Sequence, residues 1–289
     1  MKPAHRGMLL MVAFAALWAA VELIAPFLQR PYFAYQVVWT RYAVQLTFML
    51  ALFGWRDPAS LIRTRRPVFQ LARSLLMLVM PASWIMATHR GEAAGTLMGL
   101  FWLSPLFIVG LACALLRERP GYGLWIAAAT ASAGAMLLMR PHFDLSLPEL
   151  ALPLIMAGSF SLYVVMTRSL RTESTRANLF YTALGVFLCL SPLMPRVWIT
   201  PTAHDLVILI AIGLFGCAFL YMLDCAAAAA PVSDWAPLTA LQPVIILAIT
   251  AVSAHERPMP GSWVAVALVA AAAVLALLPD SRAERRYAI

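Results

Sequence analysis

Two oppositely charged side chains, Glu22 and Arg41, stand within consecutive apolar stretches near the start of the chain. An ionisable group inside a bilayer costs about 2.5–3.5 kcal/mol on insertion scales, so each charge needs a partner or a task. Helices joined by a short connection are normally neighbours, which brings the two side chains within reach of one another. One interpretation is a structural ion pair. The other is that Glu22 binds a substrate amine or a coupling proton, while Arg41 is a fixed cation that adjusts the carboxylate.

Two further carboxylates, Asp224 and Asp234, bracket the alanine run 226–230. Asp234 stands where a following helix would begin, and it is expected to cap that helix. Asp224 lies inside the end of its apolar stretch, where a buried carboxylate suits a proton-coupled transporter. Glu22 and Asp224 are therefore the predicted proton-coupling residues, and both, together with Arg41, are candidates for substrate binding.

Four aromatic residues fall near the middle of apolar stretches: Trp18, Trp84, Trp102 and Tyr163. A tryptophan in such a position packs against its neighbours more often than it binds a ligand, although its flat face suits organic molecules. We predict that these four residues contact the substrate.

Gln242 is also a predicted substrate contact, because it directly precedes Pro243, as Ser104 precedes Pro105. Proline removes a backbone donor and frees a carbonyl one turn earlier. Both prolines are therefore expected to kink their helices, either to expose polar backbone to a cavity or to act as hinges.

The composition is that of an integral membrane protein. Hydrophobic residues make up 63% of the 289 residues and charged residues only 12%, against about 45–50% and about 25% in soluble domains. The net charge of +8 does not indicate nucleic-acid binding, since the basic residues lie in short breaks between apolar runs. That placement is typical of membrane topology signals.

Roughly 20 apolar residues in a helix cross a hydrocarbon core about 30 Å thick. By this measure the sequence predicts ten transmembrane helices. They cover residues 7–28, 33–54, 68–88, 92–116, 121–139, 148–168, 177–194, 205–224, 232–253 and 260–279.

The basic residues are unevenly divided between the two sides of the predicted membrane. Fifteen fall on the side of both termini: Lys2, Arg6, Arg56, Arg63, Arg65, Arg66, Arg73, Arg117, Arg119, Arg168, Arg171, Arg176, Arg282, Arg285 and Arg286. Five fall on the other side: Arg30, Arg90, Arg140, Arg196 and Arg257. Because cytoplasmic loops carry the excess of Lys and Arg, both termini are predicted to be cytoplasmic.

One junction is written twice, as RERPGYGLW at 117–125 and HERPMPGSW at 255–263. Residues 105–139 align with 243–277 without a gap, with Pro, Glu-Arg-Pro, Gly and Trp in register. Five predicted spans separate the copies, and an odd number places them on opposite sides of the membrane. The sequence therefore predicts an all-α integral membrane protein whose ten transmembrane helices form two inverted five-helix repeats.

With these motifs the chain resembles the drug/metabolite transporter superfamily, of the EamA type with ten helices. The likeness is carried by the segments around the two junctions, 100–141 and 238–278, and by SFSLYVVMTRSL at 159–170. One departure is Glu22 after Trp18, where the family more often has small or uncharged polar residues. The resemblance divides the chain into a first repeat at 1–145, a second at 146–281 and a cytoplasmic tail at 282–289.

The resemblance implies a multi-pass protein of the bacterial inner (plasma) membrane that acts as a secondary transporter by alternating access. Its substrates are small organic metabolites, often amino acids or other amine-bearing compounds, and transport is commonly outward. The central cavity is expected between spans 1, 3, 4, 6, 8 and 9. The expected partners are the substrate, membrane lipid and protons, whose gradient would drive transport. The protein is expected to be a monomer or a homodimer and to need no cofactor.

Other function classes stay open or are disfavoured by the residues. An uptake or exchange carrier and a lipid-translocating or structural membrane protein remain alternatives. An intramembrane enzyme is disfavoured, because all five histidines fall near predicted span ends and neither HExxH nor GxSxG occurs. The four cysteines form no CxxC pair, so no metal site is expected. The sequence contains no Gly-rich phosphate loop, so it gives no support to ATP-driven transport by this chain alone.

Overall fold

The chain folds as an all-α integral membrane protein. The computed structural model describes residues 3–91, 93–141, 147–253 and 259–278, and every regular element within these ranges is a helix. Ten helical segments among the described residues are long and apolar enough to cross a membrane. They lie at the ten predicted places, so the predicted fold class and span count are confirmed.

The helices follow one another along the chain in two groups. Those before residue 141 are α1 (Pro3–Ile24), η1 (Ala25–Phe27), α2 (Ala34–Met49), η2 (Leu50–Gly54), α3 (Ala59–Ile62), α4 (Pro67–His89), α5 (Ala94–Phe101), α6 (Ser104–Leu116) and α7 (Tyr122–Met139). Those that follow are α8 (Leu147–Ser169), α9 (Thr175–Leu190), η3 (Ser191–Leu193), α10 (Met194–Val197), α11 (Ala203–Ala229), α12 (Val232–Trp235), η4 (Ala236–Ala240), α13 (Leu241–Ser253) and α14 (Pro260–Leu277).

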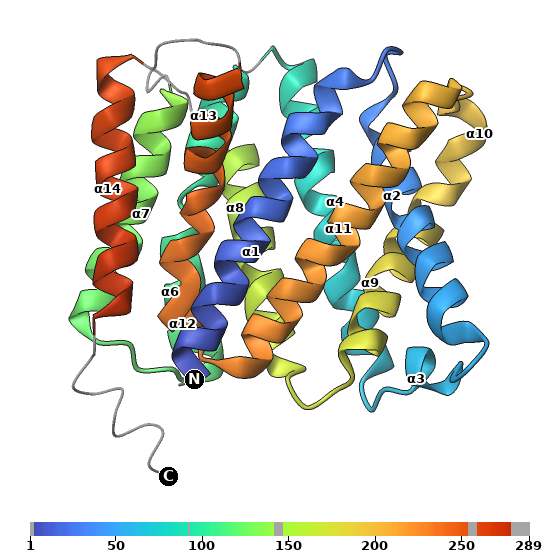
Figure 1. Ribbon diagram of the computed structural model, residues 1–289, viewed down its shortest axis with the longest axis horizontal. Helices are drawn as coiled ribbons and strands as arrows, with labels where there is room; N and C mark the ends of the chain where they lie inside the picture. Colours follow the sequence, from blue (N-terminus) through green and yellow to red (C-terminus); the bar gives the residue numbers. More distant parts are fainter. Residues whose placement is uncertain (1–2, 92, 142–146, 254–258, 279–289) are drawn as a thin grey trace.

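The bundle has two ends, one at each end of the spanning helices, and they serve below as reference points. Figure 1 shows α1 beginning and α14 ending at the same, lower edge of the bundle. This edge is called the terminal side. The connection between α1 and α2, residues 25–33, lies at the upper edge, which is called the connection side.

Helices from the two groups pack on one another in pairs. The most extensive packing joins α1 with α11, α4 with α8, and α7 with α14. The last pair runs antiparallel (Figure 1). Its close approach depends on small residues, because a methyl group on Gly134 would lie 2.9 Å from the Val269 side chain. Neither group therefore forms a separate bundle.

The fourth and ninth spans are both interrupted, as the two proline positions predict. α5 and α6 are separated by Trp102 and Leu103, and Pro105 stands in the first turn of α6. The ninth span is α12, η4 and α13, with Pro243 in the first turn of α13. These broken helices bring irregular backbone into the middle of the bundle, where neighbouring protein covers it.

The start of the ninth span is capped by a residue from the first half of the chain. The Glu118 carboxylate accepts hydrogen bonds from the backbone N–H groups of Val232 (3.1 Å) and Ser233 (3.0 Å) and from the Ser233 hydroxyl (2.6 Å). Asp234 was expected to supply this cap, but it lies within the first turn of α12, whose N-cap residue is Pro231. The acceptor thus belongs to the repeated Glu-Arg-Pro junction. The second copy of that triplet, 256–258, lies outside the described residues.

Candidate functional site

A cavity of about 460 Å³ lies among α1, α2, α4, α8 and α11. Its lining includes Leu28 and Tyr32 on the connection side, and it reaches Met156 and Tyr163 in the middle of α8. The volume falls within the range of about 300–1,000 Å³ that small-molecule sites occupy. The cavity was expected to be lined by spans 1, 3, 4, 6, 8 and 9, but the ninth span contributes no residue to it. The second span lines it instead, because α2 packs against α11.

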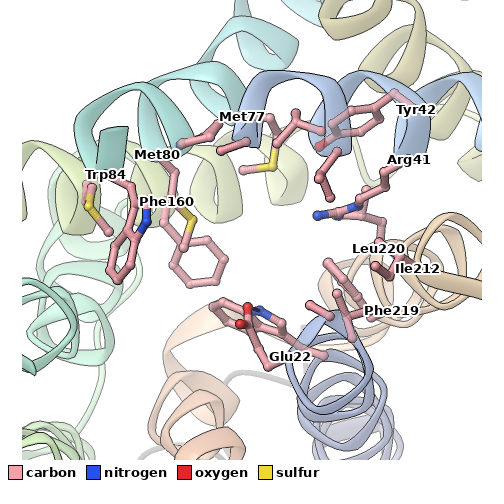
Figure 2. A pocket seen from close by; sticks show the side chains of 18 of the residues that line it. Glu22, Arg41, Tyr42, Met77, Met80, Trp84, Phe160, Ile212, Phe219 and Leu220 are labelled. Carbon is pink, nitrogen blue, oxygen red and sulfur yellow. Dashed lines mark hydrogen bonds between the residues drawn. The ribbon is translucent and has the colours of Figure 1, made fainter. Parts of the chain in front are cut away.

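The cavity wall is mostly apolar, with aromatic and methionine side chains prominent. Among the described residues that line it, Glu22 is the only acidic side chain and Arg41 the only basic one. Figure 2 shows both side chains directed toward the cavity, from α1 and α2. The sequence therefore identified the charged residues of the site, and it also identified Trp18, Trp84 and Tyr163 as lining residues.

Glu22 and Arg41 do not form the ion pair that was one of the two expectations. No nitrogen of Arg41 lies within 4.0 Å of a Glu22 carboxylate oxygen. Instead, Oε1 of Glu22 accepts a hydrogen bond of 3.2 Å from the indole Nε1 of Trp18, one turn earlier on α1. The Glu22 side chain is otherwise exposed within the cavity.

The Arg41 guanidinium is held against aromatic rings of two helices. Its Cζ lies 4.6 Å from the ring centroid of Phe219 on α11 and 5.1 Å from that of Tyr42. A methyl group on Gly216 would come within 2.5 Å of the Arg41 Nε, so this glycine provides the space for the side chain. The Nε is buried and has no hydrogen-bond partner among the described residues. Cation–π contact thus positions a guanidinium whose hydrogen bonds are largely unused.

The floor of the cavity is an aromatic cluster centred on Trp18. Its ring lies 5.5 Å from Phe160, 5.6 Å from Phe14 and 6.1 Å from Phe219, measured between centroids. Trp102 lies 5.9 Å from Trp18 but is buried behind it and does not line the cavity. Its role in this arrangement is to support the Trp18 ring.

Below this floor, toward the terminal side, a buried guanidinium organises a polar network. Arg73 on α4 is fully buried, and it donates hydrogen bonds to the hydroxyls of Thr167 (2.8 Å) and Thr182 (2.9 Å) and to the backbone carbonyl of Asn178 (2.7 Å). Its Cζ also lies 5.0 Å from the ring centroid of Tyr163. The network therefore joins α4, α8 and α9 directly beneath a residue that lines the cavity.

Asp224 belongs to this network rather than to the cavity wall. One carboxylate oxygen accepts a 2.9 Å hydrogen bond from the side-chain NH2 group of Asn178. The side-chain oxygen of Asn178 in turn accepts a 2.5 Å hydrogen bond from the Gln70 side chain. The other oxygen of Asp224 is buried without a partner among the described residues. Gln242, the remaining predicted contact, is buried at the start of α13 and likewise does not line the cavity.

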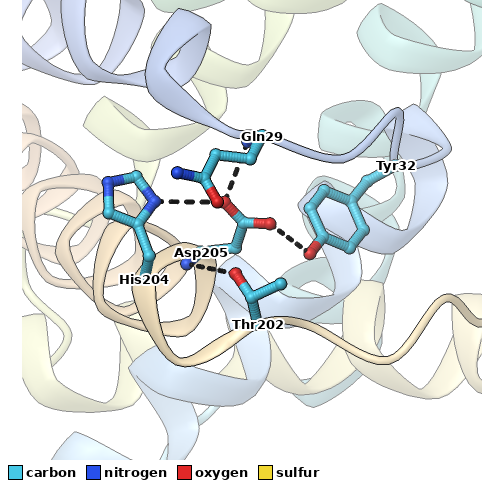
Figure 3. Close-up of polar contacts among 5 residues, drawn as sticks. All are labelled: Gln29, Tyr32, Thr202, His204 and Asp205. Atoms are coloured by element: carbon cyan, nitrogen blue, oxygen red, sulfur yellow. Dashed lines mark hydrogen bonds and ion pairs between the residues drawn. The ribbon is translucent and has the colours of Figure 1, made fainter.

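On the connection side, Asp205 ties the α1–α2 connection to the start of α11 (Figure 3). Its carboxylate accepts hydrogen bonds from the Gln29 backbone N–H (2.9 Å) and the Tyr32 hydroxyl (2.6 Å), and His204 Nδ1 lies 3.4 Å from it. Burial and the adjacent carboxylate raise the pKa of the Tyr32 hydroxyl, so that group remains a neutral donor at physiological pH. Tyr32 lines the cavity, and Asp205 therefore fixes part of the cavity's rim.

Neither Arg73 nor Asp205 was predicted as a site residue. Arg73 was predicted to be one of the basic residues on the terminal side of the membrane, which is wrong, because its side chain on α4 is fully buried. A signal was present: Asn178 and Thr182, four residues apart in an apolar stretch, share one helix face. Asp205 was overlooked because it stands at the very start of a predicted span, where an exposed carboxylate is common.

Comparison with known proteins finds transporters. The chain is 26% identical over 195 residues, 67% of its length, to the S-adenosylmethionine uptake transporter of Rickettsia prowazekii, and this match spans 65% of that protein, just under two thirds. It is 23% identical over 238 residues to the transporter of the same name in Rickettsia felis, covering 82% of the chain and 79% of the relative. It is 27% identical over 236 residues to the riboflavin transporter of Rhizobium johnstonii, covering 78% and 76%.

A solved structure matches the fold with a TM-score of 0.81 at 18% identity, over 94% of this chain and 96% of the other. No protein-family model matches the chain. The relatives named as transporters and the helical membrane fold point to a multi-pass membrane transporter of small molecules rather than an enzyme.

Proposed function

We propose that the chain is a secondary active transporter that moves a small organic metabolite by alternating access. The observation that carries the proposal is the cavity itself. It lies between helices of both halves of the chain, and it holds one carboxylate and one guanidinium that do not pair with each other. A charge kept unpaired at this depth is costly unless a ligand or proton neutralises it in part of the cycle.

The arrangement of the helices supports two inverted repeats, 1–145 and 146–281, followed by the tail 282–289. If span 1 corresponds to span 6 and span 3 to span 8, then the packing of α1 on α11 is the counterpart of the packing of α8 on α4. Both pairs are among the closest packed in the molecule. The antiparallel pair α7 and α14 is its own counterpart. This pattern fits an EamA-type member of the drug/metabolite transporter superfamily.

The two sides of the cavity differ in a way that suits alternating access. Toward the terminal side, the Trp18 cluster, the Arg73 network and the Glu118 cap all close the bundle. Toward the connection side, the lining continues to Leu28 and Tyr32. With both termini in the cytoplasm of a bacterial inner membrane, this is a conformation open to the outside. Rocking of the halves would close the Tyr32 rim and open the terminal side.

The substrate class that suits the site is an amino acid or another amine-bearing metabolite. Glu22 presents a carboxylate to the cavity for an ammonium group, and Trp18, Trp84 and Tyr163 supply flat apolar faces. S-adenosylmethionine, named for two relatives, is itself an amine-bearing amino acid. The names of these two relatives favour uptake over export as the direction.

Coupling to protons is proposed for Glu22 and Asp224. Glu22 faces the cavity, and the second carboxylate oxygen of Asp224 has no partner among the described residues. Glu22 lies above the aromatic floor, and Asp224 lies below it in the Arg73 network. We expect Glu22→Gln to abolish the pH dependence of transport while the protein still folds.

Purified protein in proteoliposomes provides the test. Uptake of radiolabelled S-adenosylmethionine and of a panel of amino acids is measured with and without an imposed pH gradient, at several external pH values. Saturable uptake that is lost when the aromatic floor of the cavity is disrupted, for example in Trp18→Ala, supports a transporter. If no solute in the panel is carried above the level of empty liposomes, the assignment to amino acids and amines is wrong.

A further inference from the structure

We propose that Arg41 and Glu22 recognise the two charged ends of a zwitterionic substrate, with Arg41 binding its carboxylate and Glu22 its ammonium. The uncharged part of the substrate lies on the aromatic and methionine surface between them. This inference rests on the proposed function and narrows its substrate class. It also gives Arg41, a predicted substrate-binding residue, a specific task.

The guanidinium of Arg41 is prepared for an anion. Phe219 and Tyr42 support the guanidinium and cannot accept strong hydrogen bonds in the plane of its N–H groups. The buried Nε has no partner among the described residues, and neither hydrogen bonds nor ion pairs join Arg41 to a protein acidic group. A planar cation with free in-plane donors matches a carboxylate, which it can bind through two parallel hydrogen bonds.

The carboxylate of Glu22 is prepared for a cation. Its one hydrogen bond, from the Trp18 indole, orients Oε1 and leaves Oε2 free for another donor. The same indole ring forms part of the cavity floor. An ammonium group at Glu22 would therefore lie beside an aromatic face, which favours cations.

The balance of charge in the cavity selects against other substrates. Glu22 and Arg41 are the only acidic and basic side chains among the described lining residues, and when both are ionised their charges cancel. A cation would pair with Glu22 and leave Arg41 unpaired, and an anion would do the reverse. A neutral molecule would desolvate both charges without compensation, which is costly in an apolar surrounding. Only a ligand with both charges satisfies both groups.

The rest of the wall indicates what the substrate carries between its charged ends. Met77, Met80, Met98 and Met156 line the cavity together with Trp18, Trp84 and Phe160. Thioether and aromatic side chains pack well on flat rings and on sulfur-containing groups. The substrate class is therefore an amino acid whose side chain is uncharged or soft, such as an aromatic or a sulfur-containing one, and which has no second carboxylate.

The test combines variants of the protein with variants of the ligand. Binding to purified, full-length protein in detergent is measured for L-methionine, L-tryptophan and S-adenosylmethionine. For the first two, the methyl ester (no carboxylate) and the N-acetyl derivative (no ammonium) are measured as well. We expect the unmodified amino acids to bind, and each derivative to bind about tenfold to a hundredfold more weakly, the usual effect of losing a charged hydrogen-bond partner.

Each variant should erase one of these preferences and leave the other intact. In Arg41→Gln, the amino acid and its ester should bind equally, while the N-acetyl derivative stays weaker. In Glu22→Gln, the preference over the N-acetyl derivative should be lost instead. Arg176→Gln is the matched control for the guanidinium, because Arg176 also stacks on an aromatic ring, Phe53 at 4.2 Å, but lies outside the cavity lining. Glu173→Gln is the control for the carboxylate, and it too lies outside the lining.

The outcomes separate this inference from the proposed function. If zwitterions bind but Arg41→Gln keeps the preference over the ester, Arg41 is not the carboxylate receptor and the inference fails. If amines and esters bind as tightly as the zwitterions, Glu22 alone recognises the substrate, and only the broader proposal survives. If no amine-bearing compound binds, or if neutral compounds such as riboflavin bind instead, both the inference and the proposed substrate class are overturned.

Discussion

The guanidinium of Arg73 lies beneath the ring of Tyr163, with its Cζ 5.0 Å from the ring centroid. Tyr163 lines the cavity on one face, so the buried cation is separated from the cavity by a single aromatic ring. Arg73 in turn hydrogen-bonds to α8 and α9 through Thr167 and Thr182. An event at the cavity floor is thus one side chain away from the contacts that hold the terminal side closed.

Replacing Arg73 should destabilise the protein strongly. Arg73→Met leaves the buried oxygens of Thr167, Thr182 and Asn178 without their charged donor. A hydrogen bond to a charged group typically contributes about 1.5–3 kcal/mol, and Arg73 makes several. The free energy of unfolding is measured by denaturant titration in detergent. Arg56→Gln is the control, because Arg56 is exposed in the turn that follows η2. It should change the free energy of unfolding by no more than about 0.5 kcal/mol.

If Arg73→Met does not fold, Thr182→Val provides a milder probe of the same network. The Thr182 hydroxyl accepts from Arg73 and donates to the Asn178 carbonyl. Its removal should cost about 1–3 kcal/mol, because a buried donor loses a partner. A stability equal to that of the unmodified protein would show that the network contributes nothing measurable.

Gly216 should control the position of Arg41. In Gly216→Ala the new methyl group would lie within 2.5 Å of the Arg41 Nε, so the guanidinium must leave its place over Phe219. We expect severalfold weaker binding of the amino acid, and the same loss of discrimination against the methyl ester as in Arg41→Gln. Gly158→Ala is the matched control. It also lies within a helix, but nothing stands within 4 Å of its added methyl group, and it should retain full affinity.

Tyr32 and Asp205 should act as one unit at the rim of the cavity. Tyr32→Phe removes the 2.6 Å hydrogen bond to the Asp205 carboxylate, and Asp205→Asn weakens it along with the bond from the Gln29 N–H. Each change should lower substrate affinity from the connection side. The double variant should lose less than the sum of the two, since the shared contact can be removed only once. Strictly additive losses, measured by binding in detergent, would show that the two residues act independently.

The sequence predicted the spans and the cavity's charged residues because both follow from strong, local signals. A bilayer requires long apolar helices, and it makes each charge within them conspicuous. Glu22 and Arg41 were therefore visible from their neighbours alone. Whether they pair is a different question, since that depends on Gly216 and Phe219 of α11, which give the guanidinium another place to lie. No spacing within the first two spans contains that information.

The residues that line the cavity depend on the rotation of each helix, which an apolar sequence specifies poorly. Trp18 and Trp102 both lie near the middle of their spans, but only Trp18 faces the cavity. The pairing of Arg73 with Thr167 and Thr182 is also not visible in the sequence, because both threonines lie on helices that are remote from Arg73 along the chain. A span with apolar residues on every side has no polar face that would reveal its orientation.

Glu118 gives the repeated Glu-Arg-Pro junction a physical role and a last test. Its carboxylate caps α12 and joins the first half of the chain to the second on the terminal side. Glu118→Ala leaves the N–H groups of Val232 and Ser233 uncapped, and it should lower the free energy of unfolding by about 0.5–2 kcal/mol. Because the contact holds the terminal side closed, the variant should also bind substrate more weakly from the connection side. Glu118→Gln keeps a side-chain acceptor and should lose less, and Arg119→Gln, at the next position, should lose neither stability nor affinity. Equal effects of the alanine substitution at 118 and the glutamine substitution at 119 would contradict a capping role for the triplet's glutamate.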